Sequence, residues 1–501
     1  MTEDLWGTSV KVIYHILESI APHLALIYNL CISEGVFPDL MKLSKVIPLF
    51  KSGDLNDVSN FRPISILPVL SKVFEKLMLN DLLGHFNRNR LLSTSQFGFT
   101  KGRSTTDAAS ALIKSIYNIW EQSCDAIGIF CDLSKAFDCV DHGTLILKLK
   151  HDGLSCNALR LMSSYLSNRT QTIVVNGSQS VGAVVKLGVP QGSILGPFLF
   201  LVYINDLPCI VENLCDIVLF ADDTSLVFKV ERKLMDFSEI NETLGKVLDW
   251  FTINNLLLNA KKTKCVRFAL PNVGPVESSI VLNGECLEFV DKAIFLGLTL
   301  DKNLQWSPHI AVLARKLSAA AFAVRKIRQL TNVDTARLVY HSYFHSVMSY
   351  GILVWGKAAD IQTIFVLQKR AIRSIYNLST RDSLREIFKD TNILTVASQY
   401  IYENIMYVIK NIDSFPKNSD THNFNTRNKN KIAIRKFRVR KVYKSFLGQC
   451  IHIYNKLPEE VLRLPLPTLK CYLKKILVSK AYYKVEDYLT DKDAWPKPVA
   501  C

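Results

Sequence analysis

The sequence predicts an α+β fold, with short strands in the middle of the chain and helices at both ends. Between residues 45 and 301, β-branched apolar runs recur between turn residues, as in KVIPLF, AIGIFCD and IVLF. Before and after this part, apolar side chains recur at helical spacing. At 501 residues the chain is long enough for two to four domains.

The first third predicts a helix, a hairpin, a second helix and a strand. Residues 1–40 are amphipathic, and KVIPLF (45–50) and FRPISIL (61–67) predict two strands joined by turn residues. Two basic residues, Lys51 and Arg62, lie near the open end of this hairpin. Residues 106–122 then predict a helix, and the β-rich run after it ends on Asp132.

The middle third predicts further hairpins. Residues 170–190 favour two paired strands, and FLFLVYINDL favours a buried helix. IVLFADDTSLVF predicts a hairpin with Asp222 and Asp223 at its apex. A turn at Asn283-Gly284 predicts another hairpin, and FLGLTLD (295–301) predicts one strand.

The last 200 residues predict helices and a basic tail. Ser307 followed by proline is typical of a helix start, with the serine as the cap. A second helix is expected over 334–350, and the Asn-rich segment 411–430 has the composition of a linker. Residues 427–444 carry nine basic side chains and no acidic one.

Charge and composition limit the function. A net charge of +16 predicts a polyanionic partner, nucleic acid ahead of a membrane surface. No run of about 18 apolar residues and no signal peptide is apparent, so we expect neither a membrane span nor secretion. Twelve cysteines without any C-x-x-C pair indicate reduced thiols and an intracellular location.

Three aspartates suggest a metal site. Adjacent carboxylates at a hairpin apex repel each other unless they share a cation, and Mg²⁺ prefers such oxygen ligands. A pair of solvated turn residues is the plainer interpretation of Asp222 and Asp223 alone. If the strand that ends on Asp132 lies beside this hairpin, the three carboxylates form a site for two metals about 4 Å apart, which is typical of phosphoryl transfer on nucleotides.

The residues around these aspartates carry a family resemblance. IFCDLSKAFDCVDH (129–142), GVPQGSILGP (188–197) and LFADD (219–223) resemble the palm motifs of reverse transcriptases from non-LTR (LINE-type) retrotransposons of the jockey-like groups. Residues 35–67, QFGFTKGRSTTDA, LLLNAKKTK, FLGLTLD and YNKLPEE are similar to further segments of that family, in the same order. The resemblance covers nearly the whole chain and implies a right-hand polymerase fold.

The resemblance also implies a division into regions. The expected regions are fingers and N-terminal helices (1–125), palm with the primer-grip strand (126–302), a helical thumb-like region (303–410), a polar linker (411–430) and a basic C-terminal region (431–501). An endonuclease and a zinc knuckle, which related elements often carry, are not apparent, so we expect a truncated copy or a fragment of a longer protein.

The resemblance assigns roles at the nucleotide. Asp132 and Asp222 would be the main metal ligands, with Asp223 as an accessory ligand. Lys51 and Arg62 would hold the triphosphate, where the alternative is a solvated loop. The incoming nucleotide and the template would lie against the turn of Gly188, Gln191 and Gly192. The ring of Phe137 would act as a steric gate against a ribose 2′-hydroxyl. Lys262 would protonate the leaving pyrophosphate, although Lys261 and Lys264 are equally reachable. A plain turn and a core aromatic are the alternatives for Gln191 and Phe137.

Nucleic-acid contacts follow from the same resemblance. The expected template and primer contacts are Phe99, Arg103, Phe295, Gly297, Arg315 and Lys316. Residues 427–444 would extend this footprint or act as a nuclear localisation signal, unless they form only a solvated surface.

The implied activity is RNA-directed DNA synthesis, in which dNTPs extend a DNA primer or target DNA on an RNA template. The expected cofactors are two Mg²⁺ ions, or Mn²⁺ in their place. We expect the protein in the nucleus and cytoplasm, without a membrane partner. A group II intron-like maturase remains open, although Ser193 stands where glycine is more usual in that group. So does an inactive remnant that only binds nucleic acid. The oligomeric state is not predicted.

Overall fold

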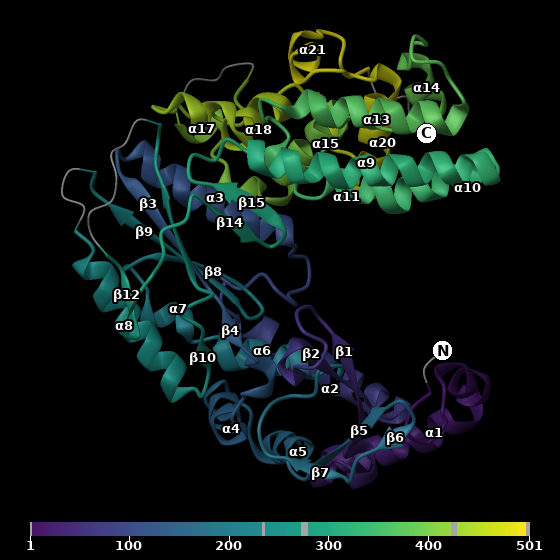
Figure 1. Ribbon diagram of the computed structural model, residues 1–501, viewed down its shortest axis with the longest axis vertical. Helices are drawn as coiled ribbons and strands as arrows, with labels where there is room; N and C mark the ends of the chain where they lie inside the picture. Colours follow the sequence, from purple (N-terminus) through teal and green to yellow (C-terminus); the bar gives the residue numbers. More distant parts are fainter. Residues whose placement is uncertain (1–2, 233–235, 272–278, 422–427, 497–501) are drawn as a thin grey trace.

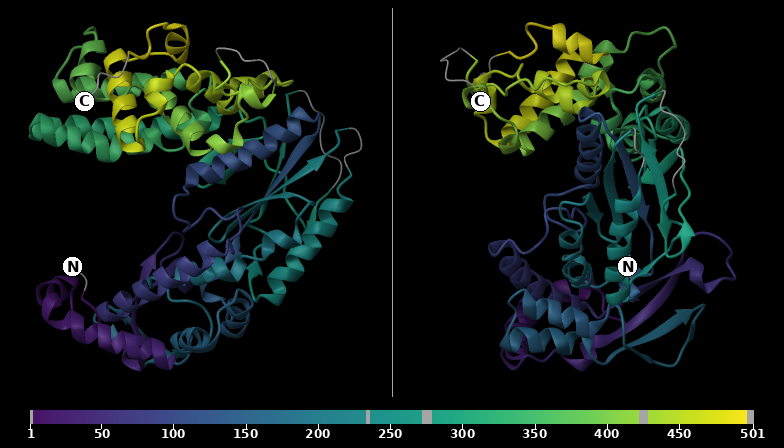
Figure 2. Two further views of the ribbon diagram at one scale, coloured as in Figure 1. Left: turned by 180° about the vertical axis from the view of Figure 1, so that it is seen from behind. Right: turned by 90° about the vertical axis from the view of Figure 1, so that its left-hand side faces the viewer.

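The computed structural model describes residues 3–232, 236–271, 279–421 and 428–496. The chain forms an arc with two arms (Figure 1), a lower one of N-terminal helices with a small sheet and an upper one of C-terminal helices. A central sheet joins the arms, and the two views of Figure 2 show the same arrangement from behind and from the side. The mixture of helices and antiparallel sheet confirms the predicted α+β class.

The lower arm is built on a mixed sheet. Strand β1 (Leu43–Phe50) pairs antiparallel with β2 (Phe61–Ile66) and parallel with β5 (Arg169–Val175). Strand β5 also pairs antiparallel with β6 (Ser178–Gln179) and β7 (Ala183–Val185). Both predicted strand pairs in this part of the sequence are therefore confirmed. The helices of this arm include α1 (Val10–Glu34), α2 (Val69–Arg88), α4 (His142–His151) and α5 (Cys156–Leu166).

Helix α1 corrects the expectation that no segment is long and apolar enough to cross a membrane. By length and composition it meets that test, with a mean hydropathy of 1.4 in a window that is 11% buried. The sequence pattern hid this because Lys11, Glu18 and two histidines interrupt the apolar run without outweighing it. Core helices and signal sequences pass the same test, so the finding alone does not indicate a membrane span.

The central sheet has the order β11-β3-β9-β8 and is antiparallel throughout. Its strands are β3 (Asp125–Cys131), β8 (Asp216–Phe220), β9 (Asp223–Val230) and β11 (Lys264–Phe268). Both faces are covered. Ala126 belongs to a core with helix α3 (Thr105–Glu121) and the upper arm, whereas Ile127 and Ile129 belong to a core with α6 (Gly196–Ile204). This explains the continuous apolar run in β3.

Shorter elements frame the sheet. They are α7 (Leu207–Ile210), α8 (Ser238–Ile253), the pair β4 (Leu133–Ser134) and β10 (Leu257–Leu258), and the hairpin β12 (Val281–Leu282) and β13 (Glu285–Cys286). The predicted turn at Asn283 and Gly284 is confirmed. Both residues have positive φ, 51° and 76°, as a two-residue hairpin turn requires.

Three local predictions need correction. The segment predicted as one strand over 295–301 is the hairpin of β14 (Lys292–Phe295) and β15 (Leu298–Asp301), because Leu296 and Gly297 turn with positive φ. Ser307 is the first residue of α9 rather than its cap, and its hydroxyl donates to Asp360. Asp223 is the first residue of β9, so the apex of the β8–β9 hairpin is Ala221 and Asp222.

The upper arm is helical, and most of its buried side chains belong to one hydrophobic core, beside a small second cluster of Val408, Ile432, Cys450 and Ile451. Helix α9 (Ser307–Leu330) packs along α13 (Ile361–Tyr376). The helix expected over 334–350 is confirmed as α10 (Val333–Val339), a π-helical turn and α11 (Ser346–Ser349). The others are α12 (Ile352–Trp355), α14 (Arg385–Asp390), α15 (Val396–Lys410), α16 (Asn418–Thr421), α17 (Arg440–Lys444), α18 (Phe446–Tyr454), α19 (Glu459–Leu462), α20 (Leu466–Lys480) and α21 (Val485–Thr490). Helices α9 and α20 share the same buried cluster, which also includes α3.

Candidate active site

The tip of the β8–β9 hairpin is held from one side by residues 95–98. The N–H of Phe97 donates to the carbonyl of Leu219 at 2.8 Å, which extends the sheet edge beyond β8. Gln96 Oε1 then accepts from the N–H groups of Ala221 at 3.1 Å and Gly98 at 2.7 Å. A Cβ on Gly98 would lie 2.3 Å from the Ala221 nitrogen, so only glycine allows this approach. The backbone that presents Asp222 is therefore fixed in place.

Asp132 follows β3 on the strand next to this hairpin. Since Cys131 pairs with Thr224, continuing the antiparallel register sets Asp132 opposite Asp223. Cβ atoms of opposed residues lie about 5 Å apart in such a ladder. The backbone of Asp132 is held from the other side, because the Asn259 N–H donates to its carbonyl at 2.9 Å. The fold thus brings together the three aspartates that the sequence singled out.

The charges of these groups act on one another. Burial and the charges of Asp222 and Asp132 raise the pKa of Asp223 to about 6, and Lys51 opposes this rise. Burial and the charge of Asp132 also raise the pKa of Asp222, against the effects of Lys51 and Arg62. Carboxylates that repel each other in a partly buried place favour a bound cation.

The described residues contain no group of three or more His, Cys, Asp or Glu that is arranged to hold a metal ion as it stands. The chemistry of the donors nevertheless fits a divalent cation, since they are hard oxygen ligands with raised affinity for positive charge. The exposed cations Lys51 and Arg62 belong to the β1–β2 region and face the same site, which suits a polyphosphate.

Phe137 lies in the turn after Asp132. Its ring stacks on Phe200 of α6, with centroids 4.6 Å apart, and contacts the edge of Phe99 at 6.3 Å. Its carbonyl accepts from the Val189 N–H at 2.8 Å. Phe137 is half-buried and Phe99 is 60% exposed, so two aromatic rings line one side of the site.

The turn from Gly188 to Gly192 joins this aromatic pair to the lower arm. Gln191 Nε2 donates to Asp138 Oδ1 at 2.9 Å, and its carbonyl accepts from the Ser65 N–H at 2.7 Å. Gly192 has φ of 126°, and a Cβ there would lie 2.4 Å from the Ser65 carbonyl oxygen. Glycine is therefore required where the turn meets β2.

A buried glutamate supports the same turn and was not predicted. Glu75 of α2 is fully buried, and its Oε2 accepts from the N–H groups of Ile194 at 2.7 Å and Leu195 at 3.1 Å. Burial raises its pKa, against these hydrogen bonds and the charge of Arg169. The sequence does not single out Glu75, because a lone glutamate in a helical segment is usually exposed to solvent. Gln96 stands within the quoted segment QFGFTKGRSTTDA, but nothing in that segment indicates its bond to Ala221.

The other predicted contacts have mixed surroundings. Lys261 and Lys262 are exposed, whereas Lys264 forms an ion pair with Glu288 at 2.7 Å. The guanidinium of Arg103 lies over the Phe97 ring, 4.8 Å from its centroid, and donates to the carbonyls of Thr94 and Gln96. It therefore also holds the segment that supports the hairpin tip.

On the upper arm, Phe295 is 3% exposed and packs on Phe130, so its side chain faces the core and only its backbone is left for nucleic acid. Gly297 and Lys316 line one cavity of about 320 Å³ at the β14–β15 turn. Arg315 lines a separate one on the other side of α9.

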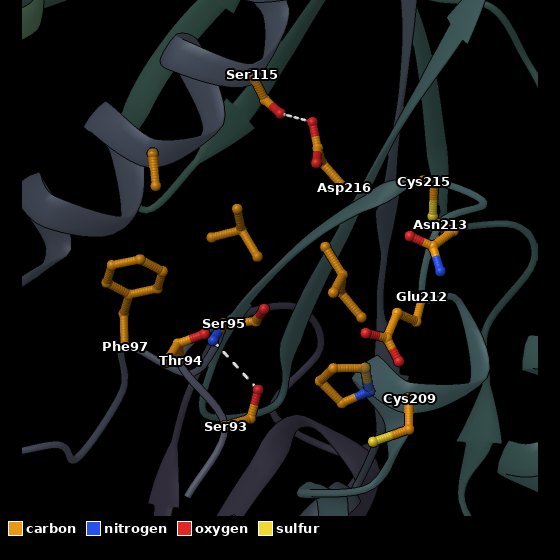
Figure 3. Close-up of a pocket in the computed structure, with 14 residues that line it drawn as sticks. Ser93, Thr94, Ser95, Phe97, Ser115, Cys209, Glu212, Asn213, Cys215 and Asp216 are labelled. Carbon is orange, nitrogen blue, oxygen red and sulfur yellow. Dashed lines mark hydrogen bonds between the residues drawn. The ribbon is translucent and has the colours of Figure 1, made fainter. Parts of the chain in front are cut away.

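A larger cavity of about 510 Å³ lies beside β8 but is not part of this site (Figure 3). Its lining includes Glu212 and Asp216, and Ser115 donates to Asp216 across it. The lining has no lysine or arginine and none of the predicted site residues. An acidic cavity of this kind repels phosphate, so it is not suited to nucleotides.

Comparison with known proteins decides the family. Residues 51–300 match the family described as reverse transcriptase (RNA-dependent DNA polymerase). The chain belongs to the reverse transcriptase family. The matched residues contain the three aspartates and the β1–β2 cations. Divalent metal ions are general in this family, in agreement with the donor set.

Individual relatives narrow the resemblance to non-LTR elements. The chain is 32% identical to a probable RNA-directed DNA polymerase from transposon BS of Drosophila melanogaster over 389 residues, 75% of this chain and 43% of that protein. It is 31% identical to the RNA-directed DNA polymerase from mobile element jockey of the same species, over 73% of this chain and 41% of that protein. It is 26% identical to a probable RNA-directed DNA polymerase from transposon X-element of Drosophila melanogaster, over 75% of this chain and 42% of that protein.

The chain therefore spans less than half of the length of the relatives it matches. The predicted jockey-like resemblance is confirmed, and the maturase alternative is not favoured by these relatives.

Proposed function

We propose that the protein is an RNA-directed DNA polymerase that extends a primer 3′-hydroxyl with dNTPs on an RNA template. The observation that carries this proposal is the meeting of Asp132, Asp222 and Asp223 from two paired strands, opposite Lys51 and Arg62. Carboxylates for metal ions beside cations for a triphosphate are the parts that nucleotidyl transfer needs.

Asp132 and Asp222 would hold two Mg²⁺ ions, or Mn²⁺, with Asp223 as an accessory ligand. Bound metal supplies acidity to the primer hydroxyl and charge neutralisation to the triphosphate. Burial first, and then repulsion between the carboxylates, raise the pKa values of Asp222 and Asp223, and a bound cation relieves that repulsion. Lys51 and Arg62 orient the triphosphate and balance the charge that develops on it.

Gln191 and Gly192 would position the base and the template, since their turn is anchored on both β2 and Asp138. Phe137 would exclude a ribose 2′-hydroxyl, because its ring is held against Phe200 and has little freedom to move away. Lys262, or the equally exposed Lys261, would give a proton to pyrophosphate. The ion pair of Lys264 with Glu288 makes it the weaker candidate.

We also propose a right-hand layout in which the lower arm is the fingers, the central sheet the palm and helices α9 to α15 the thumb. Template and primer would lie between the arms and contact Phe99, Arg103, the backbone of Phe295, Gly297, Arg315 and Lys316. Such a polymerase acts inside the cell, in the nucleus or cytoplasm. The competing proposal, an inactive remnant, predicts nucleic-acid binding without synthesis.

Primer extension on poly(rA)/oligo(dT) with Mg²⁺ tests this function. We expect the wild-type protein to incorporate dTTP and Asp222→Asn to lose this activity. Asp216→Asn is the matched control, since Asp216 lies at the other end of β8 and contacts Ser115. Absence of incorporation by folded wild-type protein, or equal incorporation by Asp222→Asn, would overturn the proposal.

A further inference from the structure

The basic C-terminal segment docks at the end of the central sheet that is remote from the carboxylates. Arg438 donates from its side chain to the carbonyls of Trp120 and Glu121, and the Glu121 carboxylate accepts from the Arg438 N–H at 2.7 Å. Lys441 donates to the Asn303 carbonyl and lies over the Trp120 ring, 5.7 Å from its centroid. These two cations anchor the segment to the protein itself, whereas the sequence left open whether residues 427–444 extend the nucleic-acid footprint, act as a nuclear localisation signal or form only a solvated surface.

Beside this anchor lies a cavity of about 660 Å³ between α17, the start of α9 and the end of α3. Its lining includes four cations and no acidic residue, in contrast to the acidic cavity beside β8. The cations are Lys357, Arg440, Lys441 and Lys444. A concave surface lined by one sign of charge concentrates ions of the opposite sign.

Two of these cations are available to a ligand. Lys357 forms an ion pair with Glu486, and Lys441 is held by Asn303. Within the described part of the chain, the side chains of Arg440 and Lys444 make no hydrogen bond or ion pair, and both are exposed.

Two acids outside the lining accept hydrogen bonds from neutral donors and keep their charge. Asp301 accepts from the N–H groups of Gln305 and Trp306, and Asp360 accepts from Ser307. The first turn of the 24-residue helix α9 faces the same cavity and adds the positive end of its dipole. Since the lining itself holds four basic side chains and no acidic one, the local field at the cavity is positive.

The cavity lies too far from the aspartates to take part in nucleotide binding. Its anchor contacts Trp120 and Glu121, just before β3, whereas Asp132 follows the other end of this strand. Seven strand residues separate the two ends, about 23 Å at 3.3 Å per residue. Figure 1 shows α17 above β3, on the side of the arc turned away from the space between the arms.

We propose that this cavity binds the phosphate backbone of nucleic acid at a second site outside the catalytic one. Arg440 and Lys444 contact the phosphates directly, and the α9 N-terminus adds to the attraction. The aromatic residues of the lining, Tyr117 and Trp306, are 2% and 5% exposed and cannot stack on bases. Recognition is therefore of the backbone and independent of sequence. This inference rests on nucleic acid as the partner but not on polymerisation.

Salt-dependent binding tests the proposal with the double variant Arg440→Gln/Lys444→Gln. Affinity for labelled duplex DNA, single-stranded RNA and an RNA/DNA primer-template of about 40 nucleotides is measured by fluorescence anisotropy. Two lost phosphate contacts lower the slope of log K against log salt by roughly 1.5 to 2 and weaken binding several-fold at low salt. The three probes show which nucleic acid uses the site.

The matched control is Lys470→Gln/Lys475→Gln, which removes two exposed positive charges from α20, away from the cavity. An unchanged slope in the first variant for all probes, or equal changes in both variants, would overturn the second site. Melting curves of all variants show whether they fold, and primer extension is scored separately, so failure of the polymerase proposal is distinguishable.

Discussion

Two aspartates at the two ends of β3 have opposite surroundings. Asp125, its first residue, is fully buried and pairs with Arg232 and Arg267, each at 2.7 Å. Asp132, just past its end, is half-buried, forms no ion pair within the described residues and lies opposite Asp223. An aspartate is thus part of a buried ion-pair cluster at one end of β3, whereas at the other end an aspartate lies close to two further carboxylates. What differs is which cations the fold brings near.

Substituting Asp132 by Asn should have the largest effect on function. We expect a loss of primer extension of about 10³-fold, since a main metal ligand and its charge are removed. The thermal stability should be equal or slightly higher, because one repulsive charge near Asp222 and Asp223 disappears. Single-turnover extension and melting curves measure both quantities. Extension within tenfold of the wild type would show that Asp132 is not a ligand.

Asp125→Asn should have the largest effect on stability. It leaves two arginines beside a buried neutral amide, and breaking a buried ion pair in this way costs about 3–5 kcal/mol. We expect a clear decrease in the urea concentration at the midpoint of unfolding. Extension per mole of folded protein should stay near the wild-type value. If Asp125→Asn and Asp132→Asn changed activity alike, the contrast between the two ends of β3 would be wrong.

Phe137→Ala tests the wall of the site rather than its charges. Removing the ring that stacks on Phe200 should open space for a 2′-hydroxyl and raise the ratio of ribonucleotide to deoxynucleotide use by roughly tenfold or more. Phe99→Ala is the control, because Phe99 touches only the edge of Phe137 and is mostly exposed. Competition between rUTP and dTTP measures the ratio. Equal sugar selectivity in both variants would remove the steric-gate assignment.

Glu75→Gln should have the smallest effect. Glutamine keeps an acceptor but loses the negative charge that strengthens the hydrogen bonds from the N–H groups of Ile194 and Leu195. This loss costs about 1 kcal/mol of hydrogen-bond free energy. We expect the KM for dNTP to rise roughly fivefold and kcat to change less. The reason is that the turn with Gln191 shifts, whereas the catalytic aspartates stay in place. Steady-state kinetics measure this split. The exposed Glu239 of α8 supplies the control variant Glu239→Gln. A loss of kcat alone would contradict a positioning role.

Local patterns sufficed for much of the fold. The β1–β2 and β8–β9 hairpins, the Asn283-Gly284 turn and helix α3 follow from period and turn chemistry, which act within a few residues. The errors are also local. Two residues of positive φ inside an apolar run made a hairpin look like one strand, and a serine before proline resembled a cap although Trp306 precedes the helix in a left-handed conformation.

The supporting residues were beyond local patterns. Glu75 and Gln96 act on backbone N–H groups about 120 residues away in the chain, and no spacing within their own segments indicates this. Arg438 looked like every other cation of its segment until its carbonyl partners at the end of α3 were known.

The sequence by itself determined that Asp222 stands at a hairpin tip beside Asp223 and that Asp132 follows a strand, because apolar alternation and turn residues encode strands and their ends. Only the tertiary structure decided that β3 pairs with β9, and hence that Asp132 meets the tip while Asp125 meets two arginines. Pairing of strands so distant in the chain depends on the closure of a long loop and on packing against α3 and α6, and neither is written in the local pattern.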